Sequence, residues 1–259
     1  MNTTRTTMMR LATATLFTMT AMTMPAHAAD APASATAASV DHEFDYDHQR
    51  EWHLESGDAQ SPVAIDSSTA RRATRYEDEN IAIEVHIADT RAKVIDNGHT
   101  IQIVPAGGSA TIRGRHFRLQ QIHFHAPAEH TLDGRTYPVE GHFVFRSQDG
   151  RLAVVAVLYR TGSENAQFAA AMDALRGADT ASLSSFHASR LMPGKVNAYY
   201  HYLGSLTTPP LTENVEWYVL DEPVELSADD IAAFRMRYSH NARTVQPLNG
   251  RPLLRYDVK

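Results

Sequence analysis

Cysteine is absent from the 259 residues of this chain. Disulfides, thiolate metal sites, iron–sulfur clusters and cysteine nucleophiles are therefore excluded, and stability must come from a packed core and from any bound metal. An excess of basic residues is also lacking, because 24 Lys and Arg face 30 Asp and Glu, for a net charge of −6. Without a basic stripe to neutralise phosphates, we expect no nucleic-acid partner. No run approaches the roughly 18 apolar residues of a transmembrane helix, so no membrane span is expected.

The first 28 residues have the pattern of a secretory signal peptide. Arg5 and Arg10 supply a positive start, a mostly uncharged stretch follows, and Ala26-His27-Ala28 fits a small-x-small cleavage site. The alternative is a disordered N-terminal tail. We expect cleavage near Ala28, export to the periplasm or out of the cell, and a net charge of −8 for the mature chain, since the segment contains two arginines and no acid.

The rest of the chain predicts one domain of the α+β class. Residues 29–40 are rich in Ala, Ser and Pro and predict a flexible linker, whereas residues 41–259 contain no comparable break. Alternating apolar and polar stretches separated by turn signals predict a large, mostly antiparallel twisted central β-sheet with a few short peripheral helices. The expected strands are residues 81–87, 100–103, 109–112, 116–125, 138–146, 152–159 and 216–220, and the expected helices are residues 165–175 and 231–238, the second opened by a capping box at Ser227.

An H-x-H…H pattern is the most informative feature of the predicted strands. Side chains alternate along a strand, so His123 and His125 share one face, with Phe124 on the other. His142 begins a second alternating run that an antiparallel neighbour can bring alongside. Three neutral imidazoles suit Zn²⁺ and leave a fourth position open, as catalytic zinc sites do. An H-x-H pair alone is also typical of core or partly exposed histidines, so the surroundings must decide.

Several separated motifs resemble the α-class carbonic anhydrases, in that family's order. The resemblance covers residues 41–254. The motifs are residues 60–65 (QSPVAI), 97–99 (NGH), 121–131 (QIHFHAPAEHT), 137–142 (YPVEGH), 204–213 (GSLTTPPLTE) and 241–248 (NARTVQPL).

The resemblance implies a zinc site and its supporting residues. His123, His125 and His142 match the three zinc ligands. Gln121 and Glu140 match residues that hold ligand histidines from behind, and the period of two places each on its histidine's face. By the same resemblance, Asn241 offers a backbone carbonyl to the remaining ligand, and His130 and Tyr202 play structural parts in the network.

The resemblance also assigns the reaction, a reversible hydration of carbon dioxide to bicarbonate and a proton through attack by zinc-bound hydroxide. Thr207 and Glu129, hereafter the gate pair, would orient that hydroxide, and His99 would carry protons to buffer, a task that suits an imidazole of pKa about 6.5. The residues expected to receive substrate are Val144, Val154, Leu206, Thr208, Val215 and Trp217. Sulfonamide or anion inhibitors are expected. The sequence does not settle the oligomeric state, and a homodimer is one possibility.

The chain departs from the family's pattern in three places. Many exported bacterial members join the N-terminal region to the loop of the gate threonine by a disulfide, but Leu211 occupies one expected site and no cysteine partner exists. Ala126-Pro127-Ala128 replaces the more familiar Trp-Gly-Ser, which predicts a reshaped rim. The N-terminal region is shortened, so placing Tyr46 in the cavity is an open assignment.

Two other functions compete with carbon dioxide hydration. A catalytically silent binding domain on the same fold is the first, although silent relatives have lost zinc ligands and this chain keeps all three. Hydrolysis of activated esters is the second, although no sequence feature supplies an acyl pocket.

Overall fold

The computed structural model describes residues 44–52, 57–73 and 81–258. These residues fall within one folded unit. The predicted signal peptide, residues 1–28, and the predicted linker, residues 29–40, lie outside the described residues, and both stay predictions. Among the described helices, none combines the length and the apolar character needed to cross a bilayer.

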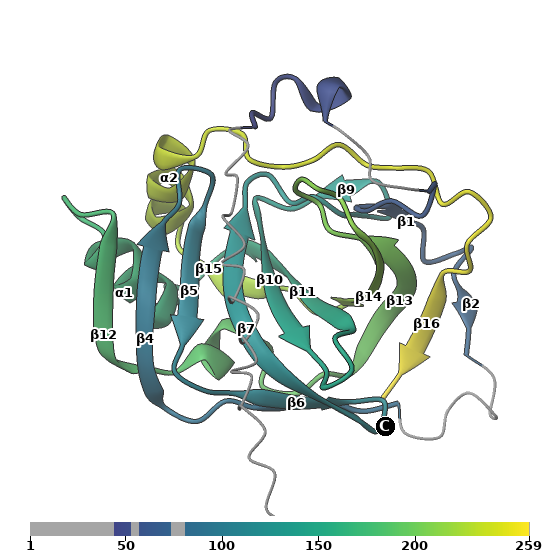
Figure 1. The fold of residues 1–259 in the computed structure, drawn as a ribbon, viewed down its shortest axis with the longest axis horizontal. Helices are drawn as coiled ribbons and strands as arrows, with labels where there is room; N and C mark the ends of the chain where they lie inside the picture. Colours follow the sequence, from purple (N-terminus) through teal and green to yellow (C-terminus); the bar gives the residue numbers. More distant parts are fainter. Residues whose placement is uncertain (1–43, 53–56, 74–80, 259) are drawn as a thin grey trace, which may run out of the picture. The chain divides into compact units, whose positions relative to one another are not determined.

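A mixed sheet of thirteen strands dominates the described part of the fold (Figure 1). Most neighbouring strands are antiparallel, but β11 runs parallel to β14 and to β15, and β16 runs parallel to β2. The strands of the main path lie in the order β12 (Thr180–Phe186), β4 (Thr90–Asp96), β5 (Ile101–Pro105), β7 (Arg115–His125), β10 (Val139–Arg146), β11 (Leu152–Thr161), β14 (Glu213–Leu220), β13 (Ala198–Ser205), β16 (Leu254–Asp257) and β2 (Arg71–Arg72).

Smaller elements flank this path. The strand β15 pairs with β11, β3 pairs with β6, and β6 also pairs with β7. A separate small sheet joins β1, β8 and β9. The bounds are β1 (Ala64–Ile65), β3 (Ile83–His86), β6 (Ser109–Ile112), β8 (Thr131–Leu132), β9 (Arg135–Thr136) and β15 (Val224–Leu226), with helices α1 (Ala166–Ala174) and α2 (Ala228–Arg237) and 3₁₀ turns η1 (Gln49–Glu51) and η2 (Ala188–Leu191).

The predicted α+β class and the large twisted sheet are confirmed. Each strand expected from the sequence overlaps one in the structure. The strands that were not expected are β1, β2, β4, β8, β9, β12, β13, β15 and β16. Strand β13 is buried on both faces at all but one residue, so it shows no alternation to read. Strand β12 consists largely of small polar residues and is mostly exposed at the edge of the sheet, where burial leaves no pattern.

Both predicted helices are present and both begin at side-chain caps. The Asn165 side chain accepts from the backbone N–H of Gln167 and Phe168 at the start of α1. Ser227 Oγ accepts from the backbone N–H of Asp230 at 3.0 Å at the start of α2, as the capping box predicts. Such caps satisfy amides that have no partner inside the helix, and each contributes about 1 kcal/mol.

Phe124 fixes the register of β7 against the larger core. Its ring lies 5.0 Å from Phe168 of α1 and 6.3 Å from Phe234 of α2, measured between centroids. Burying such a side chain stabilises the fold by roughly 1.5–3 kcal/mol. A slip of one residue would expose Phe124 and drive His123 and His125 into the apolar core. The core therefore dictates that both histidines face the opposite side of the sheet.

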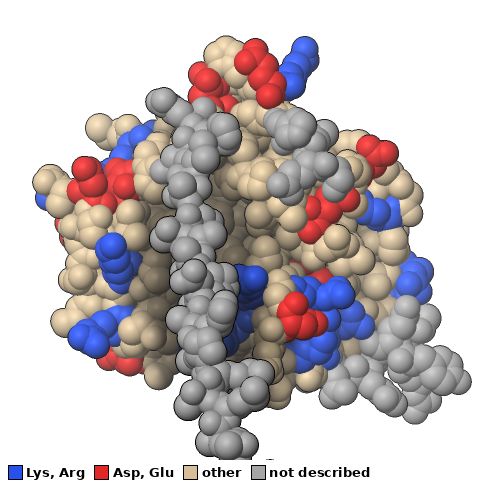
Figure 2. All heavy atoms as spheres, viewed as in Figure 1, with Lys and Arg blue, Asp and Glu red and all other residues tan. Residues whose placement is uncertain are grey.

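A second, smaller core lies on that histidine-bearing side and includes Val144, Val154 and Trp217. At the surface, Figure 2 shows basic and acidic side chains interspersed on the face in view, with uncharged surface between them. Charge is therefore mixed across this face.

Candidate metal centre

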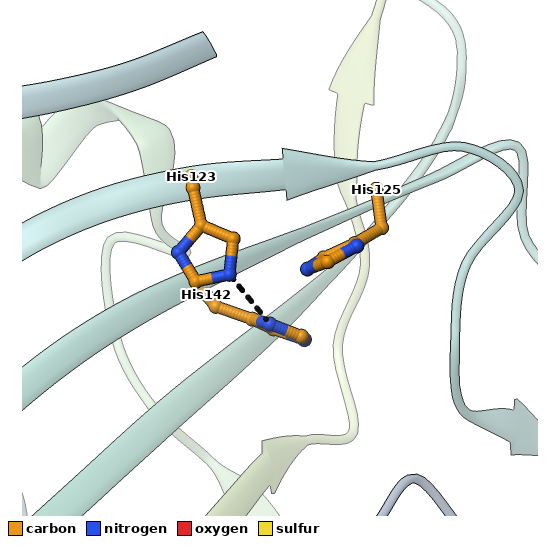
Figure 3. A group of neighbouring side chains, drawn as sticks. All are labelled: His123, His125 and His142. Carbon is orange, nitrogen blue, oxygen red and sulfur yellow. Dashed lines mark hydrogen bonds between the residues drawn. The ribbon is translucent and has the colours of Figure 1, made fainter. Parts of the chain in front are cut away.

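Adjacent antiparallel strands bring three histidines together. His123 and His125 lie on β7, and His142 on β10 stands directly opposite His123 in the register. Their rings point toward a common space (Figure 3). One nitrogen from each ring lies within 4.8 Å of the corresponding nitrogens of the other two. The period of two and the hairpin pairing thus place the rings where the sequence predicts.

The nitrogen on the far side of each ring is held by an acceptor. His142 Nε2 lies 2.8 Å from Glu140 Oε1, and His125 Nδ1 lies 2.6 Å from the backbone oxygen of Asn241. His123 Nδ1 lies 2.9 Å from Gln121 Oε1. Carboxylate and carbonyl oxygens can only accept, so these contacts fix the hydrogen on the far nitrogen. The near nitrogens are consequently unprotonated in the neutral rings.

The near nitrogens have the spacing of ligands that share a small cation. His142 Nδ1 and His123 Nε2 are 3.3 Å apart. Two nitrogens about 2.05 Å from one tetrahedral ion stand about 3.3 Å apart. Two unprotonated nitrogens cannot hydrogen bond to each other, and His125 Nε2 is buried with no hydrogen-bond partner in the described part of the chain. The donor set therefore fits Zn²⁺.

Burial keeps these rings neutral. Desolvation lowers the pKa of His125 to about 4 and holds the pKa of His123 well below the usual value, and neighbouring histidine rings oppose a positive charge on His123 as well. The pKa of His142 is lowered for the same reason, with Glu140 opposing the effect. Neutral imidazole is the form that binds metal.

Glu140 is the centre of a buried network behind the histidines. Its Oε1 also accepts from His130 Nδ1 at 2.6 Å, and its Oε2 accepts from the His130 backbone N–H at 2.8 Å. His130 Nε2 lies 2.7 Å from the Tyr202 hydroxyl, which donates to Ser61 Oγ. Burial acts to raise the pKa of Glu140, but His130 and the hydrogen bonds from His130 and His142 overcome it, so the pKa falls well below the usual value. His130 and Tyr202 occupy the structural places expected of them.

The gate pair lies beside the triad. Glu129 Oε1 is 3.4 Å from His125 Nδ1 and accepts from the backbone N–H of Arg243 at 2.7 Å. Burial raises the pKa of Glu129 to about 7, although the Thr207 hydroxyl lies near enough to lower it. The other carboxylate oxygen, Glu129 Oε2, is buried and accepts no hydrogen bond from the described residues. Thr207 is buried too.

Apolar side chains surround this space on one side. The Trp217 ring centroid is 4.9 Å from that of His142. Val144, two positions after His142, belongs with Trp217 to the smaller core. The other expected substrate residues are the buried Val154 and Val215 and the half-buried Leu206 and Thr208.

His99 lies apart from the triad in the loop after β4. Its ring stacks on Phe44 at 4.1 Å between centroids with an interplanar angle of 11°. Together with the buried Tyr46, it lines a surface cavity of about 570 Å³. The Asn241 side chain donates to the His99 backbone oxygen at 2.9 Å, and so ties this loop to the segment that holds His125.

Two buried residues near the gate pair were missed by the sequence reasoning. Gln60 and Arg243 lie inside quoted motifs, yet nothing in the local pattern singles them out. Arg243 Nη1 donates to Gln60 Oε1 at 2.9 Å, and its backbone holds Glu129. Leu211, at one expected site of the family's disulfide, is buried in the loop that carries Thr207 and has a φ of 63°. The expected partner site near residues 55–57 lies mostly in residues 53–56, which are outside the described part of the chain.

Known proteins resemble the chain in sequence and in fold. The family of eukaryotic-type carbonic anhydrases matches residues 47–257. A carbonic anhydrase of Pectobacterium carotovorum is 38% identical over 207 residues, covering 77% of this chain and 81% of that protein. One of Neisseria gonorrhoeae is 38% identical over 204 residues, covering 77% and 78%.

Solved structures give the same picture. The α-carbonic anhydrase of Thermovibrio ammonificans in complex with the inhibitor sulfanilamide superposes with a TM-score of 0.70 at 37% identity, covering 76% of this chain and 87% of that one. Dioscorin complexed with ascorbate also superposes, with a TM-score of 0.71 at 26% identity and coverage of 78% and 87%.

Proposed function

The chain belongs to the eukaryotic-type, or alpha, carbonic anhydrase family, and from that premise we propose that His123, His125 and His142 hold a zinc ion at which carbon dioxide is reversibly hydrated. Family membership supports the reaction. The observation that carries the zinc site is the convergence of three unprotonated ring nitrogens whose opposite nitrogens are all held by acceptors.

Zinc, when bound, supplies a water whose pKa is lowered far below that of bulk water, to about 7, a value taken from carbonic anhydrase itself. The protein's own part begins with the outer acceptors. Glu140, Gln121 and the Asn241 carbonyl keep each ring in the ligating tautomer and raise its basicity.

The gate pair would orient the reacting oxygen. Glu129 is fixed by the Arg243 amide, which leaves its Oε2 free to accept a proton-donating contact from Thr207 Oγ1. A hydroxyl that donates to Glu129 can only accept from its other neighbour. Thr207 Oγ1 would therefore favour ligands that carry a hydrogen and reject those that do not.

The apolar side chains and His99 would divide the remaining work. Val144, Val154 and Trp217 are buried and expose no polar side chain toward carbon dioxide except the Trp217 indole N–H, which is already donated to the Ser205 backbone oxygen at 2.9 Å. They would exclude water and receive the neutral substrate, with Leu206, Thr208 and Val215 completing the wall. His99, half-buried at a surface cavity, would pass the released proton through its ring to buffer.

Three further expectations remain proposals. The Thermovibrio relative is in complex with sulfanilamide, so we expect this protein to bind that sulfonamide, and small inhibitory anions, at the fourth zinc position. Residues 1–28 would direct export to the periplasm or beyond, and the chain could act as a monomer or as a homodimer.

Removing one zinc ligand tests the proposal. His142→Ala should lose stoichiometric zinc and hydrate carbon dioxide at a small fraction of the parental rate, measured by metal analysis and stopped-flow assay on the mature protein. His201→Ala is the matched control, because His201 is also a buried histidine with one ring nitrogen held by a backbone oxygen. It should keep its zinc. Equal rates in parent and His142→Ala would refute the enzyme reading.

A silent binding domain is the second candidate, and the likeness to dioscorin complexed with ascorbate shows that the fold also occurs in a protein of another name. The intact triad argues against it. The same assay decides, because a silent domain would show no zinc-dependent hydration. Ester hydrolysis has no acyl pocket in its favour.

A further inference from the structure

A single buried amide connects the two segments that carry the gate pair. Gln60 is 4% exposed and lies in the loop that precedes β1. Gln60 is distant from the three histidines in the sequence and is not one of the proposed zinc ligands. All four hydrogen-bonding positions of the amide have partners, which is the full capacity of the group.

The amide oxygen faces donors from two directions. Gln60 Oε1 accepts from Arg243 Nη1 at 2.9 Å and lies 3.2 Å from Ser205 Oγ, whose single hydrogen is shared with the Leu206 backbone oxygen at 2.7 Å. Arg243 is the residue whose backbone N–H holds Glu129. Ser205 ends β13, two positions before Thr207.

The amide nitrogen faces two acceptors near residue 213, at the other end of the loop 205–213 that begins at Ser205. Gln60 Nε2 donates to Glu213 Oε1 at 3.1 Å and, more weakly, to the Leu211 backbone oxygen at 3.4 Å. Glu213 Oε1 is also held by the Ala59 backbone N–H at 2.7 Å. Both ends of the loop 205–213, which carries Thr207, are therefore fixed to one side chain.

We propose that Gln60 is a positioning residue for the gate pair, one that sets the Thr207 loop against the Arg243 segment that holds Glu129. The role rests on the proposed function of that pair. The polarity of the amide is what matters: the oxygen must face the guanidinium and the nitrogen must face the Glu213 carboxylate. A side chain of the same size with two oxygens would place a carboxylate against Glu213 and the Leu211 carbonyl, with no hydrogen for either.

The test exchanges the amide of residue 60 and the carboxylate of residue 213, which contact each other. Gln60→Glu changes the amide to a carboxylate at almost constant volume and faces Glu213 with a like charge. The double variant Gln60→Glu with Glu213→Gln removes the like charge and places an NH₂ donor opposite the new carboxylate. Recovery is partial, because the Ala59 N–H and the Gln60 amide reach the same oxygen of Glu213, and an NH₂ group at that position cannot accept from Ala59. Gln148→Glu, in the exposed turn between β10 and β11, is the control for an added charge.

Two readouts follow the loop and the reaction. In the zinc-free protein, backbone hydrogen exchange should become about tenfold faster at Leu206, which donates to the Thr212 backbone oxygen, and at Arg243 in Gln60→Glu. In the zinc-loaded protein, kcat/KM for carbon dioxide hydration should fall about tenfold. The double variant should return both to within about threefold of the parent, and Gln148→Glu should change neither.

The outcomes separate the alternatives. Parental exchange and kcat/KM in a folded Gln60→Glu would overturn the proposal, as would a double variant that recovers neither. If Gln60→Glu does not fold, the double variant decides: exchange at Leu206 and Arg243 within about threefold of the parent supports the role, and faster exchange or failure to fold overturns it. If the parent neither binds zinc nor hydrates carbon dioxide, the proposed function fails, yet exchange in the zinc-free protein still tests whether Gln60 fixes the loop.

Discussion

Replacing Glu140 by Gln should weaken zinc binding without touching a ligand. The carboxylate accepts three hydrogen bonds, from His142 Nε2, His130 Nδ1 and the His130 backbone N–H. An amide of the same size has one oxygen for those three donors. If its oxygen keeps the two rings, its NH₂ group faces the His130 N–H.

If the amide turns the other way, its NH₂ group faces the rings instead. His142 can then accept at Nε2 only by carrying its hydrogen at Nδ1, the nitrogen that points toward His123. That tautomer cannot bind metal. Either arrangement costs about 1–3 kcal/mol for a buried group left without a partner. The carboxylate's contribution to ligand basicity is lost as well, so zinc affinity should fall by about 10–100-fold, or about 1.4–2.7 kcal/mol.

A chelator competition at equilibrium measures this change directly, alongside denaturant unfolding of the zinc-free protein. Glu216→Gln is the control, because Glu216 is also a buried carboxylate, held by Arg115, Arg151 and Tyr218. It should lose stability but keep parental zinc affinity. A zinc affinity for Glu140→Gln within twofold of the parent would refute the reasoning.

Three other perturbations have defined outcomes. His99→Ala should slow turnover at low buffer and recover in part with added imidazole, and an unchanged low-buffer rate would remove His99 from proton transfer. Burial acts to raise the pKa of Glu216, but hydrogen bonds from Tyr218 and Arg115 hold it below the usual value, so its stabilisation is present above a pH of about 4.5 and is lost as pH falls through the folded pKa. The stability gap between parent and Glu216→Gln, about 1–3 kcal/mol at pH 7, should therefore close in acid, and a gap that widened in acid would contradict this. Gly141→Ala should destabilise the fold by about 1–3 kcal/mol in denaturant unfolding, because a Cβ there would stand 2.9 Å from the Tyr159 ring, and parental stability would show that the strands yield easily.

Much of the site follows from local rules of the sequence. The period of two puts His123 and His125 on one face and Phe124 in the core, and it places Gln121 and Glu140 behind their histidines. Strand β10 returns antiparallel to β7 after residues 126–138 and sets His142 opposite His123. The face relations span two residues and the pairing of the two strands spans 19 positions, so both can be predicted before the fold is known.

The remaining relations depend on contacts between distant segments. Arg243 meets Gln60 across 183 positions and Glu129 across 114. No local period encodes such distances, so neither Gln60 nor Arg243 could be singled out. Strand β13 was missed for a related reason, because burial on both faces removes the alternation that marks a half-buried strand.

Zinc-edge X-ray absorption on the mature protein would show directly whether three histidines hold the ion. At one zinc per chain, we expect three imidazole nitrogens and one further light-atom ligand at about 2.0–2.1 Å. Fewer imidazoles around the ion, or a protein that binds no stoichiometric zinc, would contradict it.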